Sequence, residues 1–320
     1  MPTLTNPLRP VLLAAARSER IERTVSRSRL TRSLVTRFVP GAAEDKVMEA
    51  VRSLLASGRS ISVDYLGEDI SEASEADKTV RAYLSLLDAY RRLELPHTDG
   101  ARRLEVSIKL SALGQSLPDG GEELALVNAR IICQAAAEAG AWVNVDAEDH
   151  TTTDSTLAIV TELRREFPDV ATVLQAYLHR TEADCAALSG SGSRIRLCKG
   201  AYQEPAEVAF QGKEAVDASY LRCLRVLMQG EGYPMVASHD PAMIAAAQAY
   251  AAEAGRGTED YEIQMLFGIR EGEQDRLVAE GVTVRTYVPF GDDWYGYFMR
   301  RLAERPANLI FFLRSLVGRK

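Results

Sequence analysis

The sequence has no long apolar run and no excess of positive charge. None of its 320 residues belong to an apolar run near the ~18 residues that cross a bilayer, and no secretory apolar segment follows Met1. The formal net charge is −7 at pH 7, and the isoelectric point is near 5.4. This acidic balance excludes a general nucleic-acid binder, which would carry a dominant basic surface. We therefore expect a cytoplasmic protein that binds no nucleic acid.

Cysteine and glycine are too sparsely placed to form the usual binding motifs. No cysteine lies in a C-x-x-C pair or near a histidine at metal-ligand spacing; the four are Cys133, Cys185, Cys198 and Cys223. We expect free thiols in a reducing compartment, with no metal site. Gly190 and Gly192 precede a predicted strand and lack a third partner. They therefore form no G-x-G-x-x-G dinucleotide fingerprint.

The first 58 residues have helical patterning throughout. Apolar residues recur at helical spacing over 10–16, 21–38 and 47–55. Residues 17–37 are rich in Arg and Ser, as in a transit peptide, but Glu19 and Glu22 favour a basic amphipathic helix of the folded protein. We expect a helical N-terminal arm at 1–58 and one catalytic domain at 59–320.

After Gly58, short β-rich runs alternate with helical stretches. The eight runs lie at 60–66, 104–110, 142–146, 171–177, 194–199, 234–238, 261–266 and 282–288. The helical stretches lie at 71–93, 121–139, 153–166, 182–188, 205–229, 241–253, 271–280 and 292–304. Such alternation predicts parallel βαβ units. Eight units favour an α/β fold of the closed (β/α)8 TIM-barrel type over an open doubly wound sheet.

A polar or titratable residue stands at or near the end of every predicted strand. These residues are Asp64, Lys109, Asp146, Gln175, Arg196 with Lys199, His239, Gln264 and Tyr287. Barrel enzymes place their chemistry at the C-terminal ends of the strands. The whole set therefore predicts an active site at that rim. A single polar residue at a solvated strand end would not predict one.

Lys109 and Asp146 allow more than one interpretation. Lys109 could bind an anionic substrate, form a Schiff base, or pair with Asp146 from the next strand. Asp146 could orient Lys109, act as a base, or bind a metal together with its neighbours and His150. We favour a metal-free site.

The fifth strand carries cations on both of its faces. Alternation places Arg194, Arg196 and Cys198 on one face and Lys199 on the other. An inward Arg196 would need an acidic or anionic partner. Gly200 permits close backbone approach to a ligand, and the helix start beside His239 could hold a phosphate group.

The helix expected after the eighth strand carries a polar stripe. At about 100° per residue, Arg300, Arg301 and Glu304 fall within a narrow sector around Tyr297. Such a stripe could be a solvated face. This helix can, however, cover the barrel mouth, and paired guanidiniums suit one carboxylate well.

Together these segments resemble the proline dehydrogenase family over nearly the whole chain. The arm contributes RFVPG at 37–41. The barrel contributes SIKLSAL (107–113), NVDAE (144–148), QAY (175–177), RLCKGAY (196–202), ASHD (237–240), QMLFG (264–268), RTYVPFG (285–291) and YFMRRLAE (297–304). Two departures are visible, because Cys198 stands where Val is common and Phe267 where His or Tyr is common. We expect altered packing there and no loss of activity.

The resemblance implies a distorted (β/α)8 barrel with a late helix over its mouth and FAD bound noncovalently across the strand ends. It implies that Arg300, Arg301 and Lys109 bind the proline carboxylate. The residues implied to enclose the pyrrolidine ring are Tyr287, Tyr297, Leu266, Ala201 and Tyr202. Those implied to lie around the flavin are Asp146, Ala147, Gln175, Arg196, Lys199, Gly200, Ala201, Ser238 and His239. Asp146 and Arg196 are expected to be catalytic, and Glu304 to orient the cationic cluster.

The reaction implied by the resemblance is oxidation of L-proline to Δ1-pyrroline-5-carboxylate. Hydride would pass from proline C5 to flavin N5, and the electrons would then reach a quinone. The protein would touch the inner membrane at most peripherally. A separate Δ1-pyrroline-5-carboxylate dehydrogenase would consume the product. Three alternatives stay open: a related cyclic amine such as hydroxyproline, a Schiff-base lyase on the same barrel, and a barrel used only for binding.

Overall fold

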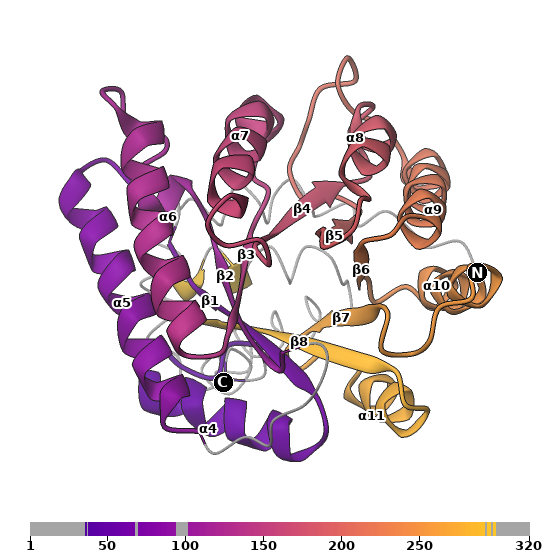
Figure 1. Ribbon diagram of the computed structural model, residues 1–320, viewed down its shortest axis with the longest axis horizontal. Helices are drawn as coiled ribbons and strands as arrows, with labels where there is room; N and C mark the ends of the chain where they lie inside the picture. Colours follow the sequence, from indigo (N-terminus) through magenta and orange to yellow (C-terminus); the bar gives the residue numbers. More distant parts are fainter. Residues whose placement is uncertain are drawn as a thin grey trace, which may run out of the picture.

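Eight parallel strands close into a barrel in which each strand pairs with its neighbours in sequence (Figure 1). The computed structural model describes residues 36, 38–67, 70–93, 102–291, 293–295 and 297–298. The strands are β1 (Ser60–Tyr65), β2 (Leu104–Ile108), β3 (Trp142–Val145), β4 (Ala171–Gln175), β5 (Arg194–Cys198), β6 (Tyr233–Ala237), β7 (Glu262–Leu266) and β8 (Thr283–Phe290). The pairing of β1 with β8 completes the closed (β/α)8 fold that the alternation predicts.

Helices surround the barrel and connect successive strands (Figure 1). They are α4 (Glu44–Ala56), α5 (Ala73–Arg91), α6 (Gly121–Glu138), α7 (Thr153–Arg164), α8 (Thr181–Leu188), α9 (Lys213–Gln229), α10 (Pro241–Glu253) and α11 (Glu271–Ala279), with short 3-10 turns at Ser111–Leu113 and His150–Thr152. Helix α10 begins as predicted, because Asp240 caps it and Pro241 is its first residue. None of the helices in the described part of the chain is both long and apolar enough to cross a membrane.

One predicted helix is wrong over its first third. We predicted a helix over 205–229, but α9 begins at Lys213. Residues 199–212 form a loop whose backbone bonds to the end of β4, since Phe210 N donates to Tyr177 O over 2.7 Å and His179 N donates to Val208 O over 2.9 Å. Gly212 then has a positive φ of +81°, which α9 cannot continue through.

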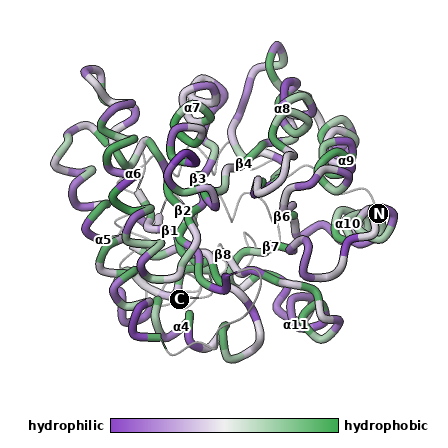
Figure 2. The backbone as a smooth tube through the Cα atoms, in the orientation of Figure 1, coloured by the Kyte–Doolittle hydropathy of each residue, from purple (hydrophilic) through white to green (hydrophobic). Residues whose placement is uncertain are grey.

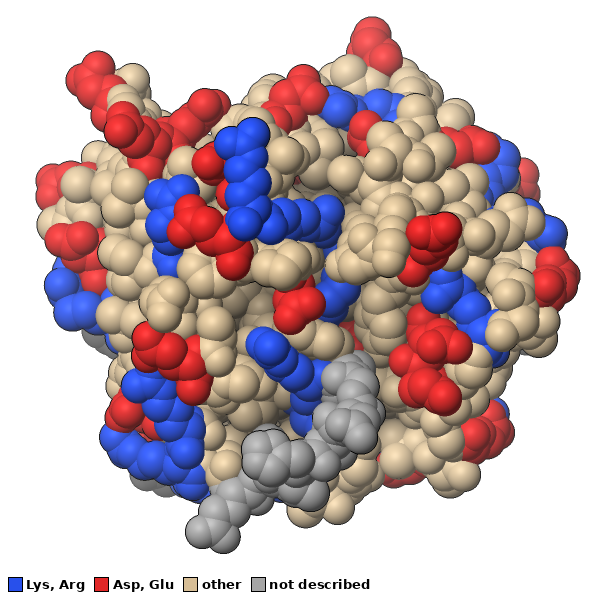
Figure 3. Space-filling model, in the orientation of Figure 1, with Lys and Arg blue, Asp and Glu red and all other residues tan. Residues whose placement is uncertain are grey.

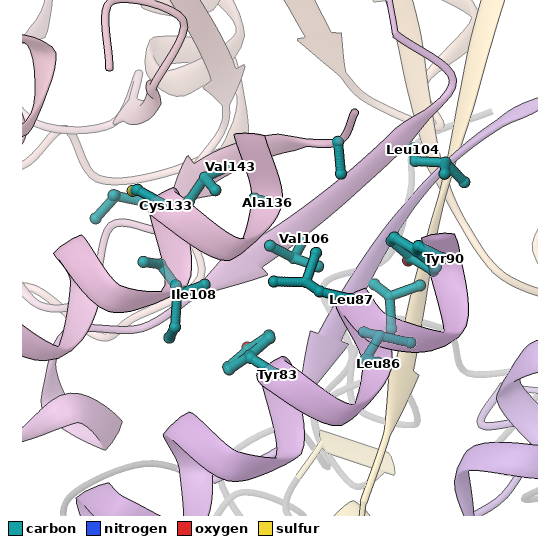
Figure 4. Close-up of a cluster of buried hydrophobic side chains, with 14 of the residues drawn as sticks. Tyr83, Leu86, Leu87, Tyr90, Leu104, Val106, Ile108, Cys133, Ala136 and Val143 are labelled. Carbon is teal, nitrogen blue, oxygen red and sulfur yellow. The ribbon is translucent and has the colours of Figure 1, made fainter. Parts of the chain in front are cut away.

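The outward faces of the strands meet the helices in an apolar layer. Figure 4 shows Tyr83, Leu86, Leu87 and Tyr90 of α5 directed toward Leu104, Val106 and Ile108 of β2. A second buried cluster joins β5, β6 and β7 to α9 and α10. In the hydropathy-coloured tube, green segments accordingly alternate with purple ones along each helix (Figure 2). Burial of these apolar surfaces against one another supplies the main stabilisation of the fold.

The inward faces of the strands are largely polar. Side chains from non-adjacent strands bond across the barrel: Arg194 and Arg196 of β5 reach Glu105 of β2, and Arg196 also reaches Ser62 of β1. Arg285 of β8 and Glu262 of β7 form a further buried ion pair. This interior departs from the branched aliphatic layers usual in such barrels.

The N-terminal arm is described only in its last part. Helix α4 buries Val47, Met48 and Val51 in the same apolar cluster as β1. The helices predicted at 10–16 and over most of 21–38, and most of the late helix at 292–304, lie outside the described residues. The division of the chain at residue 58 stays a prediction.

Candidate active site

Four of the polar residues predicted at the rim form one hydrogen-bonded network with Asp146 at its centre; they are Asp146, Arg196, Gln264 and Tyr287. Asp146 directly follows β3. Its Oδ1 accepts from Arg196 Nη1 over 2.7 Å, from Ser107 Oγ over 2.7 Å and from Asn144 Nδ2 over 2.9 Å. Its Oδ2 accepts from the Tyr287 hydroxyl over 2.9 Å. Asp146 therefore fixes groups from β5 and β8 at the C-terminal mouth of the barrel.

Lys109 pairs with Asp64, a strand-end residue to which sequence analysis assigned no role of its own. Its ammonium lies 2.9 Å and 2.8 Å from the two carboxylate oxygens of Asp64, and 3.9 Å from Asp146 Oδ2. Burial raises the pKa of the Asp64 carboxyl, and the positive charge of Lys109 opposes that rise. The pairing of Lys109 with Asp146, one of the alternatives considered from the sequence, is thus secondary to the pairing of Lys109 with Asp64.

Arg196 points into the barrel and meets two acids, the kind of partner that an inward arginine requires. All five of its N–H groups donate within the protein: Nε to Gln264 over 2.5 Å, Nη1 to Ser107 and Asp146, and Nη2 to Ser62 and Glu105. Burial alone would lower the pKa of Arg196, but the carboxylates of Asp146 and Glu105 outweigh it and raise the pKa above its usual value. The guanidinium is therefore a fixed, permanent positive charge below the rim.

Tyr287 and Leu266 supply half-buried surface beside these charges. Burial raises the pKa of Tyr287 well above its usual value, so the phenol stays protonated and donates to Asp146. The guanidinium carbon of Arg196 lies 5.4 Å from the centre of the Tyr287 ring. Tyr297, in the short described part of the late helix, is buried as well. The mouth thus combines aromatic surface with held cations.

The loop after β5 carries Gly200, Ala201 and Tyr202 to the rim. Gly200 has a φ of +111°, and a Cβ on it would lie 2.4 Å from the Tyr177 ring, so this position requires glycine. Ala201 is exposed and Tyr202 is half-buried. The backbone of this loop therefore lies directly against the end of β4.

A second buried carboxylate, Glu204, ties the same loop to two other strand ends. It accepts from the backbone N–H of His150 over 2.9 Å, from the Tyr177 hydroxyl over 3.3 Å, and in a short contact pairs with the His150 ring. His150 is therefore engaged by Glu204 and does not join Asp146 as a metal ligand. Among the described residues, no group of three or more His, Cys, Asp or Glu is placed to hold a metal ion.

The remaining residues predicted to contact the cofactor are distributed along the same rim. Gln175 donates to the Glu148 carbonyl over 2.7 Å, next to half-buried Ala147, and Ser238 Oγ accepts from Asp240 N over 3.1 Å. His239 Nε2 accepts from Leu266 N over 2.9 Å. Lys199 lies on the other face of β5, where it pairs with Asp217 and Asp240. Arg300, Arg301 and Glu304 lie outside the described residues.

A comparison with protein families decides which kind of barrel this is. The family model described as proline dehydrogenase matches residues 47–314. The chain belongs to the proline dehydrogenase family. Members of this family are enzymes that oxidise proline and use FAD.

Curated proteins and solved structures agree with this membership. The chain is 39% identical to proline dehydrogenase of Deinococcus radiodurans over 287 residues, which cover 89% of this chain and 90% of that protein. It is 36% identical to proline dehydrogenase 1 of Bacillus subtilis, over 90% of this chain and 92% of the relative. The crystal structure of proline utilization A from Bdellovibrio bacteriovorus, inactivated by N-propargylglycine, superposes with a TM-score of 0.79 at 25% identity. That match covers 98% of this chain and 38% of the longer protein.

The groups at the rim fit a flavin cofactor. A reduced flavin gains negative charge, and two cations lie near this mouth: Lys109 directly after β2, and Arg196 inside the barrel below the rim. Half-buried Tyr287 and Leu266 offer the apolar surface that a flat ring requires. Because the donors of Arg196 are all engaged within the protein, this residue can offer the cofactor positive charge without giving up a hydrogen bond.

Three acidic residues of the site were missed or left without a role by sequence reasoning. Asp64 stood in the set of strand-end residues, and its pairing with Lys109 needed the neighbouring positions of β1 and β2. Glu105 sits at an inward position of β2, two residues before Ser107, where strand alternation could have marked it. Glu204 lies one residue before the segment predicted to be helical, and its contact with His150, 54 residues earlier, had no sequence signal.

Proposed function

We propose that this protein oxidises L-proline to Δ1-pyrroline-5-carboxylate with FAD lying across the strand ends. The observation that carries the proposal is the network at the rim, where buried Lys109 and Arg196 flank Asp146 and Tyr287 bonds to the same carboxylate. Held cations beside a half-buried aromatic ring suit an amino acid that is gripped by its carboxylate against a flavin.

Substrate binding is assigned to residues from the strand ends and the late helix. Lys109, Arg300 and Arg301 would hold the proline carboxylate, with Glu304 orienting the two arginines. The residues that would enclose the pyrrolidine ring are Tyr287, Tyr297, Leu266, Ala201 and Tyr202. The described members of this set lie at or beside the strand ends or in the helix that follows β8, which supports the assignment.

Cofactor binding is assigned to the rest of the rim. The residues that would line the FAD site are Asp146, Ala147, Gln175, Arg196, Lys199, Gly200, Ala201, Ser238 and His239. For Lys199 the contact would lie on the outer side of β5, where Asp217 and Asp240 already hold its ammonium. Bound FAD would supply the hydride acceptor, N5 of its ring.

The chain's own residues would position the substrate and control its charge. Holding proline C5 toward the cofactor removes much of the entropic barrier to hydride transfer. Nearby cations disfavour the protonated ring nitrogen, which must lose its proton before hydride leaves the adjacent carbon. Arg196 would stabilise the negative charge gained on reduction, and Asp146 would hold Arg196 and Tyr287 in place.

We further propose a quinone as the electron acceptor and a separate Δ1-pyrroline-5-carboxylate dehydrogenase as the consumer of the product. Contact with the membrane would then be peripheral. Mixing the reduced enzyme with a soluble quinone should restore the oxidised flavin spectrum. A reduced enzyme that stays reduced with quinones but reoxidises with another acceptor would contradict the quinone assignment.

The central test is an absorption spectrum recorded before and after anaerobic addition of L-proline. We expect a yellow protein whose flavin band bleaches with proline. An unchanged spectrum in a flavin-loaded protein contradicts the proposal. Adding hydroxyproline or another cyclic amine in the same experiment measures substrate preference, which one residue of the pocket can decide.

The variant Arg301→Met tests whether the late helix binds the proline carboxylate. Loss of a charge-assisted contact to the carboxylate should raise the proline KM by about 10- to 100-fold while the protein still purifies yellow. Arg276→Met is a matched control, because Arg276 is exposed on α11 and pairs with Glu273 and Glu280 there. A near-normal KM for Arg301→Met would remove this role.

The geometry does not favour a Schiff-base lyase. Both oxygens of Asp64 hold the Lys109 ammonium, so imine formation would require this buried ion pair to break. Borohydride reduction in the presence of a carbonyl substrate should therefore leave the mass of the protein unchanged.

A further inference from the structure

Glu105 lies inside the barrel, one layer below the rim, and binds two arginines. Its side chain is 0% exposed. Its Oε1 accepts from Arg196 Nη2 over 2.7 Å, and its Oε2 accepts from Arg194 Nη2 over 2.8 Å. A third guanidinium, that of Arg285, lies 4.0 Å away. This carboxylate is therefore the meeting point of the buried cations.

The contact with Glu105 helps fix the orientation of Arg196. The guanidinium is planar, so its position is defined once its Nε and both Nη atoms are held. Gln264 holds Nε, Asp146 and Ser107 hold Nη1, and Glu105 and Ser62 hold Nη2. Of the two groups at Nη2, Glu105 is the charged and closer one.

The interior charges balance only when Glu105 is ionised. Three arginines lie inside the strands, Arg194, Arg196 and Arg285, and the acids bonded to them are Glu105, Glu262 and Asp146. Burial alone would raise the pKa of Glu105, but the arginines, led by Arg285, lower it to about 2. Glu105 therefore carries a full negative charge at neutral pH, next to the cation assigned to the flavin.

We infer that Glu105 is a positioning residue that holds Arg196 in place below the rim and offsets its charge, and so lowers the reduction potential of bound FAD. The inference rests on the proposed function only in that FAD is the ligand. We assign Glu105 no contact with either the cofactor or the substrate. A group that removes part of the positive charge of Arg196 makes the reduced, more negative flavin less favourable.

The test is a dithionite titration of Glu105→Gln against a reference dye of known potential. Gln keeps the shape and one acceptor oxygen but removes the charge. At a fixed solution potential we expect the ratio of reduced to oxidised FAD to rise about tenfold, because a unit charge acts strongly in a low-dielectric interior. Because this titration contains no proline, its outcome is separate from a failure of the proposed reaction, which the proline spectrum reports.

Glu262→Gln is the matched control. Glu262 is equally buried and also bonds to an arginine, but that arginine is Arg285. Glu262 reaches Arg196 only through Gln264, whose Nε2 donates to Glu262 over 2.5 Å. The same removal of charge should change the FAD ratio by less than about threefold. Equal shifts in the two variants, or no shift in Glu105→Gln, would overturn the inference.

A second variant covers the case in which Glu105→Gln does not fold. Glu105→Gln combined with Arg194→Met removes one acid and one base, so two arginines face two acids in the interior. Arg194 lies on the far side of Glu105 from Arg196, where its guanidinium stacks 3.5 Å from the Trp142 ring. We expect a smaller rise in the FAD ratio in the same direction. An unchanged ratio in this folded, yellow variant also overturns the inference.

Discussion

The outer and inner faces of the barrel strands make opposite kinds of contact, apolar on the outer face and polar on the inner face. On the outer face of β2, Val106 and Ile108 pack against helices in an apolar layer. On the inner face of β2, Glu105 and Ser107 bond to Arg196 across the barrel. Apolar contacts tolerate small shifts, whereas each buried charge needs a partner at hydrogen-bond distance. The outer layer therefore supplies stability, and the inner layer fixes the positions of the rim groups.

The surface differs from both layers. On the face that Figure 3 shows, the described Lys, Arg, Asp and Glu side chains are interspersed. Among the described residues, surface ion pairs within one helix include those of Arg276 with Glu273 and Glu280. Exposed pairs of this kind contribute little to stability, because water solvates each partner nearly as well.

The largest expected effect comes from breaking the inner layer. Arg285→Met leaves Glu262, and in part Glu105, as a buried charge without its main partner. The free energy of unfolding, measured with urea, should fall by about 3–5 kcal/mol. Arg276→Met provides the exposed control and should leave the urea midpoint nearly unchanged. Similar losses of stability in both variants would show that the interior ion pairs matter no more for stability than the surface ion pairs.

The next effect comes from the outer layer. Leu87 is fully buried between α5 and the barrel, and Leu87→Ala should lower the free energy of unfolding by about 3 kcal/mol. The control is Val127→Ala on α6, where the side chain is 45% exposed. Leu87→Ala should leave the proline KM unchanged, since its cavity lies outside the strands. A raised KM would show that the outer layer also sets the geometry of the rim.

Acid should weaken the inner layer selectively. The pKa of Glu105 is lowered to about 2 in the folded protein, against a usual value of 4.5, because three arginines outweigh its burial. A lowered pKa gives stability that is fully present above pH 4.5 and is lost as the pH falls toward 2. The loss should be on the order of 2–3 kcal/mol in urea unfolding of the FAD-free protein. Glu105→Gln should be less stable at neutral pH and should lose less on acidification; an identical acid profile would contradict the ionised state.

The smallest expected effect concerns the loop after β5. Glu204→Gln keeps an acceptor for His150 and Tyr177 but removes the charge. The substitution should lower the free energy of unfolding by about 1 kcal/mol. Protease cleavage within 203–211 should become faster, because this loop depends on Glu204 for its contact with the β3 end. Glu207→Gln, an exposed residue of the same loop, is the control. Equal cleavage rates in the two variants would show that the backbone bonds alone hold the loop.

Sequence reasoning identified the barrel because each strand is a short, buried, β-rich run. All eight predicted strands are confirmed, with ends that differ by at most two residues. Alternation also grouped Arg194 and Arg196 on one face correctly, since every second residue of a strand shares a face. The structure shows that this face points into the barrel. The stretch 205–212 was wrongly predicted to be helical. It starts with Pro205 in a pattern typical of a helix start, but backbone hydrogen bonds with Tyr177 and His179 hold it as a loop.

The partners of the rim residues could not be predicted in the same way. Arg196 and Glu105 are separated by 91 residues in sequence, and only closure of the barrel brings them together. Likewise, Asp146 was considered from the sequence as a partner of Lys109. The parallel pairing of β1 with β2 instead places Asp64 closer to the Lys109 ammonium. Residue types and faces follow from local pattern, whereas pairings depend on strand order and register.

Closure of the barrel also affects how the chain is made. Arg285 donates to the carbonyl of Ile61, 224 residues earlier, so β1 can pair with β8 only after the whole barrel has been synthesised. Until β8 leaves the ribosome, the nascent chain exposes two open strand edges, and Glu262 lacks its arginine. Unpaired edges and uncompensated polar groups are what make incomplete chains prone to aggregate. A polypeptide that stops after α11 should therefore depend on chaperones to stay in solution.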